Sequence, residues 1–454
     1  MVLKSSVVIV GDIAIGGDNV VSVQSMTNTN TLDTNGTVEQ IKSLSAVGCQ
    51  IVRLTVRNVQ EANNLKNIKV ELSKRKINIP FVADVHFNPE VAEVAAKIVE
   101  KVRINPGNYV DKRRNKTSFT KEEDKREIQN ISHRLKPLLE ICKKHKTAIR
   151  IGTNHGSLSE RILFKYGNTA KGMVESALEF VEICRDFDFH NIILSMKSSH
   201  VPTIISSNQL LVTEMQKRGY YYPLHLGVTE AGDGDAARIK SAAGIGSLLA
   251  EGIGDTIRVS LTEKPENEIP FAKKLIENYG KRKRLELPKN SIGITEPLEY
   301  SLSYKNISSE DLLINASVDF CRLHFKIKAK SLRILNGGAE NKTLSDEILQ
   351  ALGIKYTKAE YIACPSCGRT LFNIIEELEK VRQKTSHLKG LKIAVMGCIV
   401  NGIGEMAEAD YGYVGSGPEK VSLYKSKQLV KKNISITSAV DELVELIKKN
   451  NDWK

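Results

Sequence analysis

Short apolar runs recur eight times between residues 20 and 261 of this 454-residue chain. They fall at 20–23, 51–54, 80–83, 101–104, 148–151, 192–195, 223–226 and 256–259. Segments with a helical period lie between them, for example at 38–47, 89–99, 173–184 and 236–250. Strands that alternate with helices in this way predict an α/β fold, the (β/α)8 or TIM barrel. A doubly wound open sheet is the alternative.

Polar and charged side chains follow these runs, at the positions where a barrel carries its active site. Catalytic groups of such barrels cluster at the carboxyl ends of the strands. The candidate residues there are Arg53, Asp84, His86, Arg103, Arg150, Asn154, Lys197, Glu230, Arg258 and Ser260. Buried cations are costly unless an anion or a carboxylate meets them, and arginine forks and amides suit phosphate oxygens. The mouth is therefore expected to bind a phosphate or diphosphate, with a structural ion network through Asp84 and Glu230 as the alternative.

Two of these residues suggest more specific chemistry. Glu230 is a carboxylate facing a cationic pocket, so it is a candidate general acid or a clamp on a substrate hydroxyl. A structural salt bridge is the other interpretation. His86 is a candidate substrate contact, although a lone histidine is more often a polar residue with satisfied hydrogen bonds.

The composition is typical of a soluble globular protein, with 41% hydrophobic and 26% charged residues. No apolar run approaches the roughly 18 residues that span a bilayer, and the N-terminus lacks a signal-peptide pattern. The net charge of +13 suits anionic partners. No aromatic residues interleave with the basic runs, which argues against a nucleic-acid partner. A cytoplasmic protein without membrane or nucleic-acid partners is expected.

The character of the chain changes after residue 262. Residues 263–355 are rich in lysine and polar side chains and have only weak apolar periodicity. Such a length is too great for a structureless loop. The predicted division is a barrel at 1–262, a linker or small inserted domain at 263–355, and a small α/β domain at 356–454.

Three of the seven cysteines fall in two loops of the last domain. Cys364 and Cys367 have the C-x-x-C spacing with which one turn binds a metal or cluster, and Cys398 would complete three thiolates. A helix predicted at 370–387 would begin beside the C-x-x-C loop and favour thiolate over thiol. The remaining cysteines, expected to be buried structural thiols, are Cys49, Cys142, Cys184 and Cys321.

The fourth ligand decides which metal these thiolates suit. Glu405 follows Cys398 by seven residues and is a candidate oxygen ligand. Three thiolates and one weaker oxygen ligand suit an iron–sulfur cluster with one iron open to chemistry. Zinc held by the three thiolates and a Glu or His is the alternative.

Together with both cysteine loops, six ordered motifs resemble the 4-hydroxy-3-methylbut-2-enyl-diphosphate synthase family, iron–sulfur enzymes of the non-mevalonate isoprenoid pathway. The motifs are VQSMT at 23–27, VADVHF at 82–87, RINPGN at 103–108, IRIG at 149–152, LHLGVTEAG at 224–232 and GIGDTIRVSL at 252–261. The resemblance covers nearly the whole barrel and the C-terminal domain.

The resemblance implies a [4Fe–4S] cluster held by Cys364, Cys367, Cys398 and Glu405. It implies reductive ring opening and dehydration of 2-C-methyl-D-erythritol 2,4-cyclodiphosphate, with a ferredoxin or flavodoxin as electron donor. Glu230 would act in proton transfer, and Asn401 would lie near the cluster. The implied diphosphate contacts are Arg53, Arg103, Arg150, Asn154, Lys197, Arg258 and Ser260.

Two features depart from the family pattern. Ile403 stands where the family usually has proline, and the loss of a fixed φ could loosen Glu405. The segment after residue 262 resembles the middle domain of the family's longer form, but much reduced. In the shorter form a cluster domain caps the barrel of a second subunit, whereas the longer form lets one chain cap itself. Both arrangements stay open, and a homodimer is expected.

Overall fold

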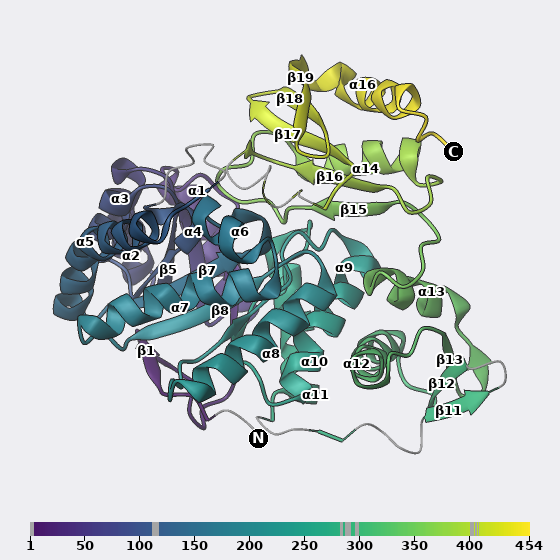
Figure 1. Cartoon of the computed structure of the whole chain (residues 1–454), viewed down its shortest axis with the longest axis horizontal. Helices are drawn as coiled ribbons and strands as arrows, with labels where there is room; N and C mark the ends of the chain where they lie inside the picture. Colours follow the sequence, from purple (N-terminus) through teal and green to yellow (C-terminus); the bar gives the residue numbers. More distant parts are fainter. Residues whose placement is uncertain are drawn as a thin grey trace.

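Eight parallel strands form a closed barrel in the N-terminal part of the chain (Figure 1). The computed structural model describes residues 4–110, 118–281, 285–286, 292–295, 299–399, 404, 406 and 408–454. The barrel strands are β3 (Ser22–Met26), β4 (Ile51–Val56), β5 (Phe81–Val85), β6 (Lys101–Ile104), β7 (Ala148–Asn154), β8 (Ile192–Lys197), β9 (His225–Leu226) and β10 (Thr256–Ile257). They pair in the order β8-β7-β6-β5-β4-β3-β10-β9, and a parallel bridge between Leu194 and Leu224 joins the two ends. The predicted barrel is therefore confirmed, in place of an open sheet.

Helices surround the barrel. They are α1 (Thr34–Ala46), α2 (Val59–Lys74), α3 (Pro89–Ala95), α4 (Pro106–Tyr109), α5 (Lys121–His145), α6 (Glu160–Tyr166), α7 (Ala170–Asp186), α8 (Val201–Lys217), α9 (Gly234–Ser241), α10 (Ser247–Ala250) and α11 (Glu268–Tyr279). In α1, the fully buried Val38, Ile41 and Leu44 recur at helical spacing on one face. The single helix predicted at 236–250 is instead α9 and α10, which a π-helical turn at Ala242–Gly246 separates. In the described part of the chain, none of the helices combines the length and the apolar character that a membrane crossing requires.

A two-stranded hairpin closes the amino-terminal end of the barrel. Strands β1 (Val8–Val10) and β2 (Ile13–Ile15) pair in antiparallel fashion. Their buried residues pack against the first residues of the barrel strands in one apolar cluster, formed by Val8, Val10, Ile15, Ile51, Val82, Ala148 and Ile193. The hairpin covers this end of the barrel with apolar side chains, and the opposite end, where the strands terminate, is the mouth.

The segment after the barrel forms a small sheet with two helices. The sheet order is β11 (Ile292–Thr295), β12 (Glu299–Tyr304), β13 (Leu332–Asn336) and β14 (Ala339–Glu340), and the helices are α12 (Ser309–Ile327) and α13 (Lys342–Ala351). Helix α12 packs closely on the π-helical turn, because a Cβ added at Gly246 would lie 2.6 Å from Cγ2 of Val318. One apolar core extends through the barrel and α12. The domain limits at residues 262 and 355 stay a prediction.

A five-stranded sheet with its own core forms the C-terminal domain. Its strands, in sheet order, are β15 (Glu360–Ala363), β16 (Lys392–Met396), β17 (Tyr411–Gly417), β18 (Lys420–Lys425) and β19 (Gln428–Ser435), with helices α14 (Ile374–Thr385) and α16 (Ile436–Lys449). Helix α14 begins at Ile374, where the Asn373 side chain accepts a hydrogen bond from the Glu376 amide and caps the first turn. The prediction that the C-x-x-C loop opens a helix is wrong, because Ile374 lies seven positions after Cys367.

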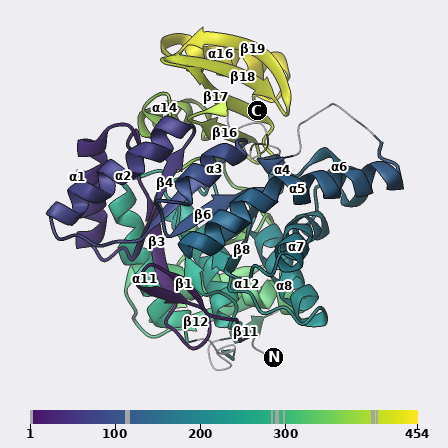
Figure 2. The same ribbon diagram turned by 90° about the vertical axis from the view of Figure 1, so that its left-hand side faces the viewer.

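The C-terminal domain lies over the mouth of its own barrel (Figure 1, Figure 2). A parallel bridge joins Ala231, in the loop after β9, to Ala363 at the end of β15. The Thr262 hydroxyl donates to the carbonyl oxygens of Ala363 and Cys364, at 3.3 and 3.2 Å. The C-x-x-C loop is thereby fixed directly above the ends of the barrel strands.

Candidate active site at the barrel mouth

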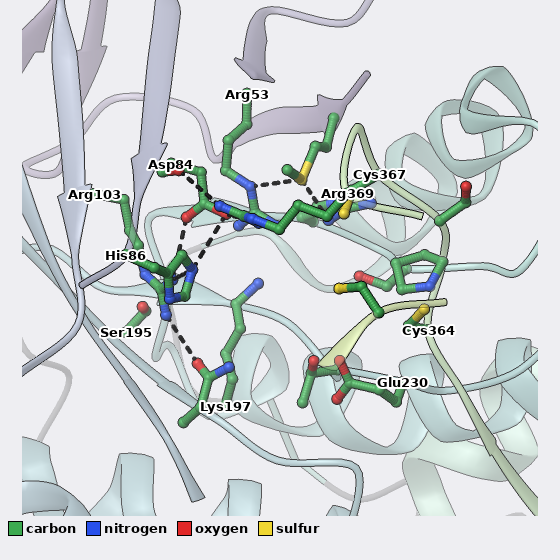
Figure 3. A pocket seen from close by; sticks show the side chains of 18 of the residues that line it. Arg53, Asp84, His86, Arg103, Ser195, Lys197, Glu230, Cys364, Cys367 and Arg369 are labelled. Carbon is green, nitrogen blue, oxygen red and sulfur yellow. Dashed lines mark hydrogen bonds and ion pairs between the residues drawn. The ribbon is translucent and has the colours of Figure 1, made fainter. Parts of the chain in front are cut away.

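One pocket lies between the barrel mouth and the cysteine loops (Figure 3). It brings together most of the residues predicted from the sequence. Those that line it are Arg53, Asp84, His86, Arg103, Arg150, Asn154, Lys197, Glu230, Arg258, Ser260, Cys364, Cys367 and Cys398. The other two candidates, Asn401 and Glu405, lie outside the described residues. Residues at the ends of separate barrel strands thus meet residues of the C-terminal domain in one cavity.

The pocket carries an excess of positive charge. Among the described residues, six basic side chains and two carboxylates line it. Arg369, which follows the C-x-x-C loop, is the basic residue that the sequence did not predict. Its side chain reaches from the cysteine side of the pocket to Asp84 (Figure 3). Such a cavity favours an anion with more than one negative charge.

Asp84 is the acid around which the basic groups of the mouth gather. One of its oxygens, Oδ1, lies 3.2 Å from Nη1 of Arg103. The other, Oδ2, lies 3.5 Å from Nε2 of His86 and 3.3 Å from Nη1 of Arg369. Burial opposes ionisation of this carboxyl, but the charges of Arg53 and Arg103 outweigh burial and hold the pKa of Asp84 well below its usual range. Asp84 is therefore a carboxylate at neutral pH.

Arg150 and Lys197 have less compensation. Arg150 is 1% exposed, and its Nε and Nη1 atoms have no hydrogen-bond partner among the described residues. Burial, followed by repulsion from Arg53 and Arg103, lowers the pKa of Arg150 well below its ordinary value. Burial, followed by repulsion from Arg53 and Arg150, does the same to the pKa of Lys197. An anion in the mouth would stabilise the charged form of both side chains.

Arg258 has a carboxylate partner that the sequence did not indicate. Its Nη2 and Nε atoms lie 3.0 and 3.2 Å from the two carboxylate oxygens of Glu268. Glu268 is 1% exposed and begins α11, after the predicted end of the barrel. Since this fork already binds a carboxylate, Arg258 offers an anion less than Arg150 does.

Glu230 lies in the pocket with a strained backbone. Its φ is 49°, a left-handed conformation that glycine adopts readily and other residues seldom do. The residue is 4% exposed, and Figure 3 shows its side chain pointing into the pocket away from the Asp84 cluster. Strain of this kind is typical of functional sites, where surrounding contacts hold one side chain in place.

Acid should destabilise the fold through His86. Burial, followed by the charge of Arg103, lowers the pKa of His86 to about 3, whereas an unfolded histidine titrates near 6.5. Between these values the unfolded chain binds more protons, so the free energy of unfolding falls as the pH drops from 6.5 toward 3. In urea unfolding, the free energy of unfolding should fall by roughly 2–3 kcal/mol less between pH 7 and pH 4.5 in His86→Gln than in the unchanged protein. The exposed His133 is the control: His133→Gln should leave the pH profile unchanged, and an unchanged profile for His86→Gln would contradict the assignment.

Three thiols from two loops form the upper wall of the pocket. Cys364 and Cys367 come from the loop after β15, and Cys398 comes from the loop after β16. The loops touch closely, because a Cβ added at Gly397 would lie 2.6 Å from Cγ2 of Thr370. The amide of Gly397 also donates to Sγ of Cys364 at 3.3 Å, a contact that favours thiolate.

This wall has the chemistry that an iron–sulfur cluster requires. Burial, followed by the proximity of Cys398 and Cys367, raises the pKa of Cys364 well above its ordinary value. Bound iron would offset both effects and hold the thiols as thiolates. Among the described side chains, no three His, Cys, Asp or Glu converge as closely as a single metal ion requires. Three thiols that face one pocket from two loops are a donor set of the kind that iron–sulfur clusters use. The other four cysteines are buried, as predicted.

Ion pairs and a histidine–carboxylate contact on several elements hold the C-terminal domain against the barrel. Nζ of Lys240 lies 2.8 Å from Oε1 of Glu360, and Nδ1 of His155 lies 3.3 Å from Oε1 of Glu408. Arg382 of α14 pairs with Asp233 at the start of α9. One chain therefore supplies both walls of the pocket and caps itself.

Comparisons with known proteins follow the same two-part division. The family model described as "GcpE TIM-barrel domain" matches residues 5–273, and the model described as "GcpE protein C-terminal domain" matches residues 360–449. Among solved structures, dihydropteroate synthase from Burkholderia cenocepacia is 11% identical, covers 60% of this chain and 98% of its own, and has a TM-score of 0.40.

Similar proteins extend over the full chain. The 4-hydroxy-3-methylbut-2-en-1-yl diphosphate synthase (flavodoxin) of Phocaeicola vulgatus is 40% identical over 602 aligned positions, which cover 99% of this chain and 98% of the relative. The alignment is longer than this chain, so that relative has segments that this chain lacks. The 4-hydroxy-3-methylbut-2-en-1-yl diphosphate synthase (ferredoxin) of Prochlorococcus marinus is 46% identical, and the alignment covers 98% of this chain and 93% of that relative. The two matched regions are the barrel and the cysteine-bearing domain that meet at the pocket, and together they make up most of the chain. The chain therefore belongs to the GcpE family.

Proposed function

We propose that this chain is a 4-hydroxy-3-methylbut-2-en-1-yl diphosphate synthase, an oxidoreductase of the non-mevalonate isoprenoid pathway. One observation carries the proposal: basic side chains of the barrel and three thiols of the C-terminal domain face each other across one pocket. The names of the relatives support it, since both describe this synthase. A zinc-stabilised phosphate- or RNA-binding protein gains no support from them.

The barrel mouth would bind the diphosphate of 2-C-methyl-D-erythritol 2,4-cyclodiphosphate. Arginine forks and an ammonium group match phosphate oxygens in charge and geometry. Arg150 and Lys197 would contribute most, because burial without full compensation leaves them the most to gain from an anion. The proposed contacts are Arg53, His86, Arg103, Arg150, Asn154, Lys197, Arg258 and Ser260.

The cysteine wall would hold a [4Fe–4S] cluster through Cys364, Cys367 and Cys398, with Glu405 as the fourth ligand. When bound, the cluster supplies single electrons, which a flavodoxin or ferredoxin would deliver, as in the names of the relatives. Ring opening and dehydration to (E)-4-hydroxy-3-methylbut-2-enyl diphosphate consume two electrons and two protons and release one water.

The remaining residues would position the substrate and manage protons. Glu230 faces the cavity from the loop after β9, where its carboxyl could give a proton to the departing hydroxyl. Asn401 would lie near the cluster and its ligand. The C-terminal domain over the mouth would exclude bulk water from the reaction. The homodimer and the cytoplasmic location stay predictions.

Anaerobic purification tests this function. We expect a coloured protein that contains iron and acid-labile sulfide, and reductant-dependent turnover of the cyclodiphosphate. Cys398→Ser should lower turnover by more than about a hundredfold, because loss of a cluster ligand costs more than the roughly 10–100-fold loss that follows removal of an outer-shell partner. Cys321→Ser is the matched control, since Cys321 is a buried thiol of α12, remote from the pocket. A colourless protein with stoichiometric zinc, or full turnover by Cys398→Ser, would refute the proposal.

A further inference from the structure

A buried ion pair connects the cysteine loop to the floor of the pocket. Nη1 of Arg369 lies 3.3 Å from Oδ2 of Asp84, and its Nη2 donates to the Asp84 carbonyl oxygen at 3.0 Å. The side chains of Arg369 and Asp84 are 6% and 4% exposed. The two residues are 285 positions apart in the chain, and they meet because the C-terminal domain lies on the barrel.

Asp84 is an unfavourable neighbour for a diphosphate. Its carboxylate lines the same pocket as Arg103 and Lys197. It also lies 3.2 Å from the Arg103 guanidinium, which belongs to the proposed diphosphate contacts. A diphosphate bound there would compete with Asp84 for Arg103 and would repel the carboxylate in a buried, weakly screened site. A further cation on Asp84 would remove this cost.

We infer that Arg369 is a positioning residue that compensates Asp84 when the diphosphate binds, so that diphosphate binding and closure of the C-terminal domain strengthen each other. This inference rests on the proposed diphosphate site. With the domain lifted, Asp84 loses the Arg369 contact and its charge opposes the ligand. With the domain in place, Arg369 binds Oδ2 of the carboxylate, so that Asp84 no longer depends on Arg103 at Oδ1 alone for compensation. By linkage, a ligand that binds the closed form more tightly stabilises closure by the same factor.

The geometry explains why an arginine suits this position. One nitrogen of the guanidinium contacts the carboxylate and another contacts the main chain of the same residue. A single ammonium group lacks this fixed fork. Gly368 permits the approach, because a Cβ added there would lie 2.6 Å from the Thr29 carbonyl oxygen in the loop after β3. The Arg369 contact is therefore formed by a loop that is seated closely on the barrel.

Calorimetric titration of inorganic diphosphate into the full-length holoprotein tests the inference. We expect Arg369→Gln to weaken diphosphate binding at least about tenfold, because Asp84 is left uncompensated. In the Asp84→Asn background, where no charge needs compensation, the same change should weaken binding by less than about threefold. Arg218→Gln is the matched control, because it breaks the pairs of Arg218 with Glu182 and Glu175 within the barrel, and none of these residues lines the pocket or touches the C-terminal domain contact described above. It should leave the dissociation constant unchanged.

The outcomes separate this inference from the proposed function. If the unchanged protein does not bind diphosphate, the proposed diphosphate site itself is wrong. If it binds, but Arg369→Gln binds equally well, Arg369 has no role in compensation. An equal loss in the unchanged protein and in the Asp84→Asn background would identify a merely structural contact and overturn the inference.

Discussion

Replacing Arg150 with methionine should raise the free energy of unfolding while it strongly weakens diphosphate binding. The guanidinium is 1% exposed, two of its nitrogens lack partners among the described residues, and Arg53 and Arg103 repel it. A buried cation in this state destabilises the empty fold. Methionine fills similar space without charge, so we expect about 1–2 kcal/mol of added stability in urea unfolding. Affinity for inorganic diphosphate should fall at least about a hundredfold, because a charge-assisted fork is lost.

Arg161 provides the matched control for this change. It is 3% exposed, and its Nη1 and Nη2 atoms lie 2.8 and 2.5 Å from Asp124 and Glu179. Removing it takes the arginine partner from Glu179 and leaves Asp124 with Lys165 alone, so Arg161→Met should cost about 2–3 kcal/mol of stability and leave diphosphate binding unchanged. If methionine raises the free energy of unfolding at Arg150 and lowers it at Arg161, Arg150 is identified as a residue kept for binding. A destabilised Arg150→Met protein that still binds diphosphate would contradict this assignment.

The barrel and its mouth could be predicted because their signals are local. Each strand is a short apolar run, and parallel strands bring the residues that follow them to one end of a barrel. Arg53, Arg150 and Lys197 therefore line one pocket although they are far apart in the chain. The apolar period also predicted helices, but it does not distinguish the π-helical turn at 242–246, which packs closely against α12, from a regular α-helix.

The partners of the predicted residues could not be found in this way. Glu268 pairs with Arg258 from a helix beyond the expected limit of the barrel, and Arg369 reaches Asp84 from another domain. Both contacts depend on tertiary placement. The position of Arg369, directly after Cys367-Gly368, was the available signal, since a cation beside a cysteine loop has an electrostatic reason to be there. The start of α14 was misplaced because Asn373, a capping residue, outweighs the apolar period that begins earlier.

Two inactive variants should fail to rescue each other, because one chain supplies both walls of the pocket. Arg150→Met damages the barrel wall, and Cys398→Ser damages the cysteine wall. The described contacts that join these walls, including Thr262 with Cys364 and Asp84 with Arg369, lie within one chain. If the walls came from different subunits, a mixed dimer would contain one pocket with both walls intact and one with neither.

Turnover by the two variants co-expressed with different affinity tags is the most direct measurement of this arrangement. We predict no more activity from the mixture than from either variant alone. As the reverse control, the double variant Arg150→Met/Cys398→Ser co-expressed with an equal amount of unchanged chain should retain about half of full activity if each chain caps itself, but only about a quarter if capping occurs between subunits that pair at random. Recovery of about a quarter of full activity by the two single variants would contradict self-capping and the single-chain active site.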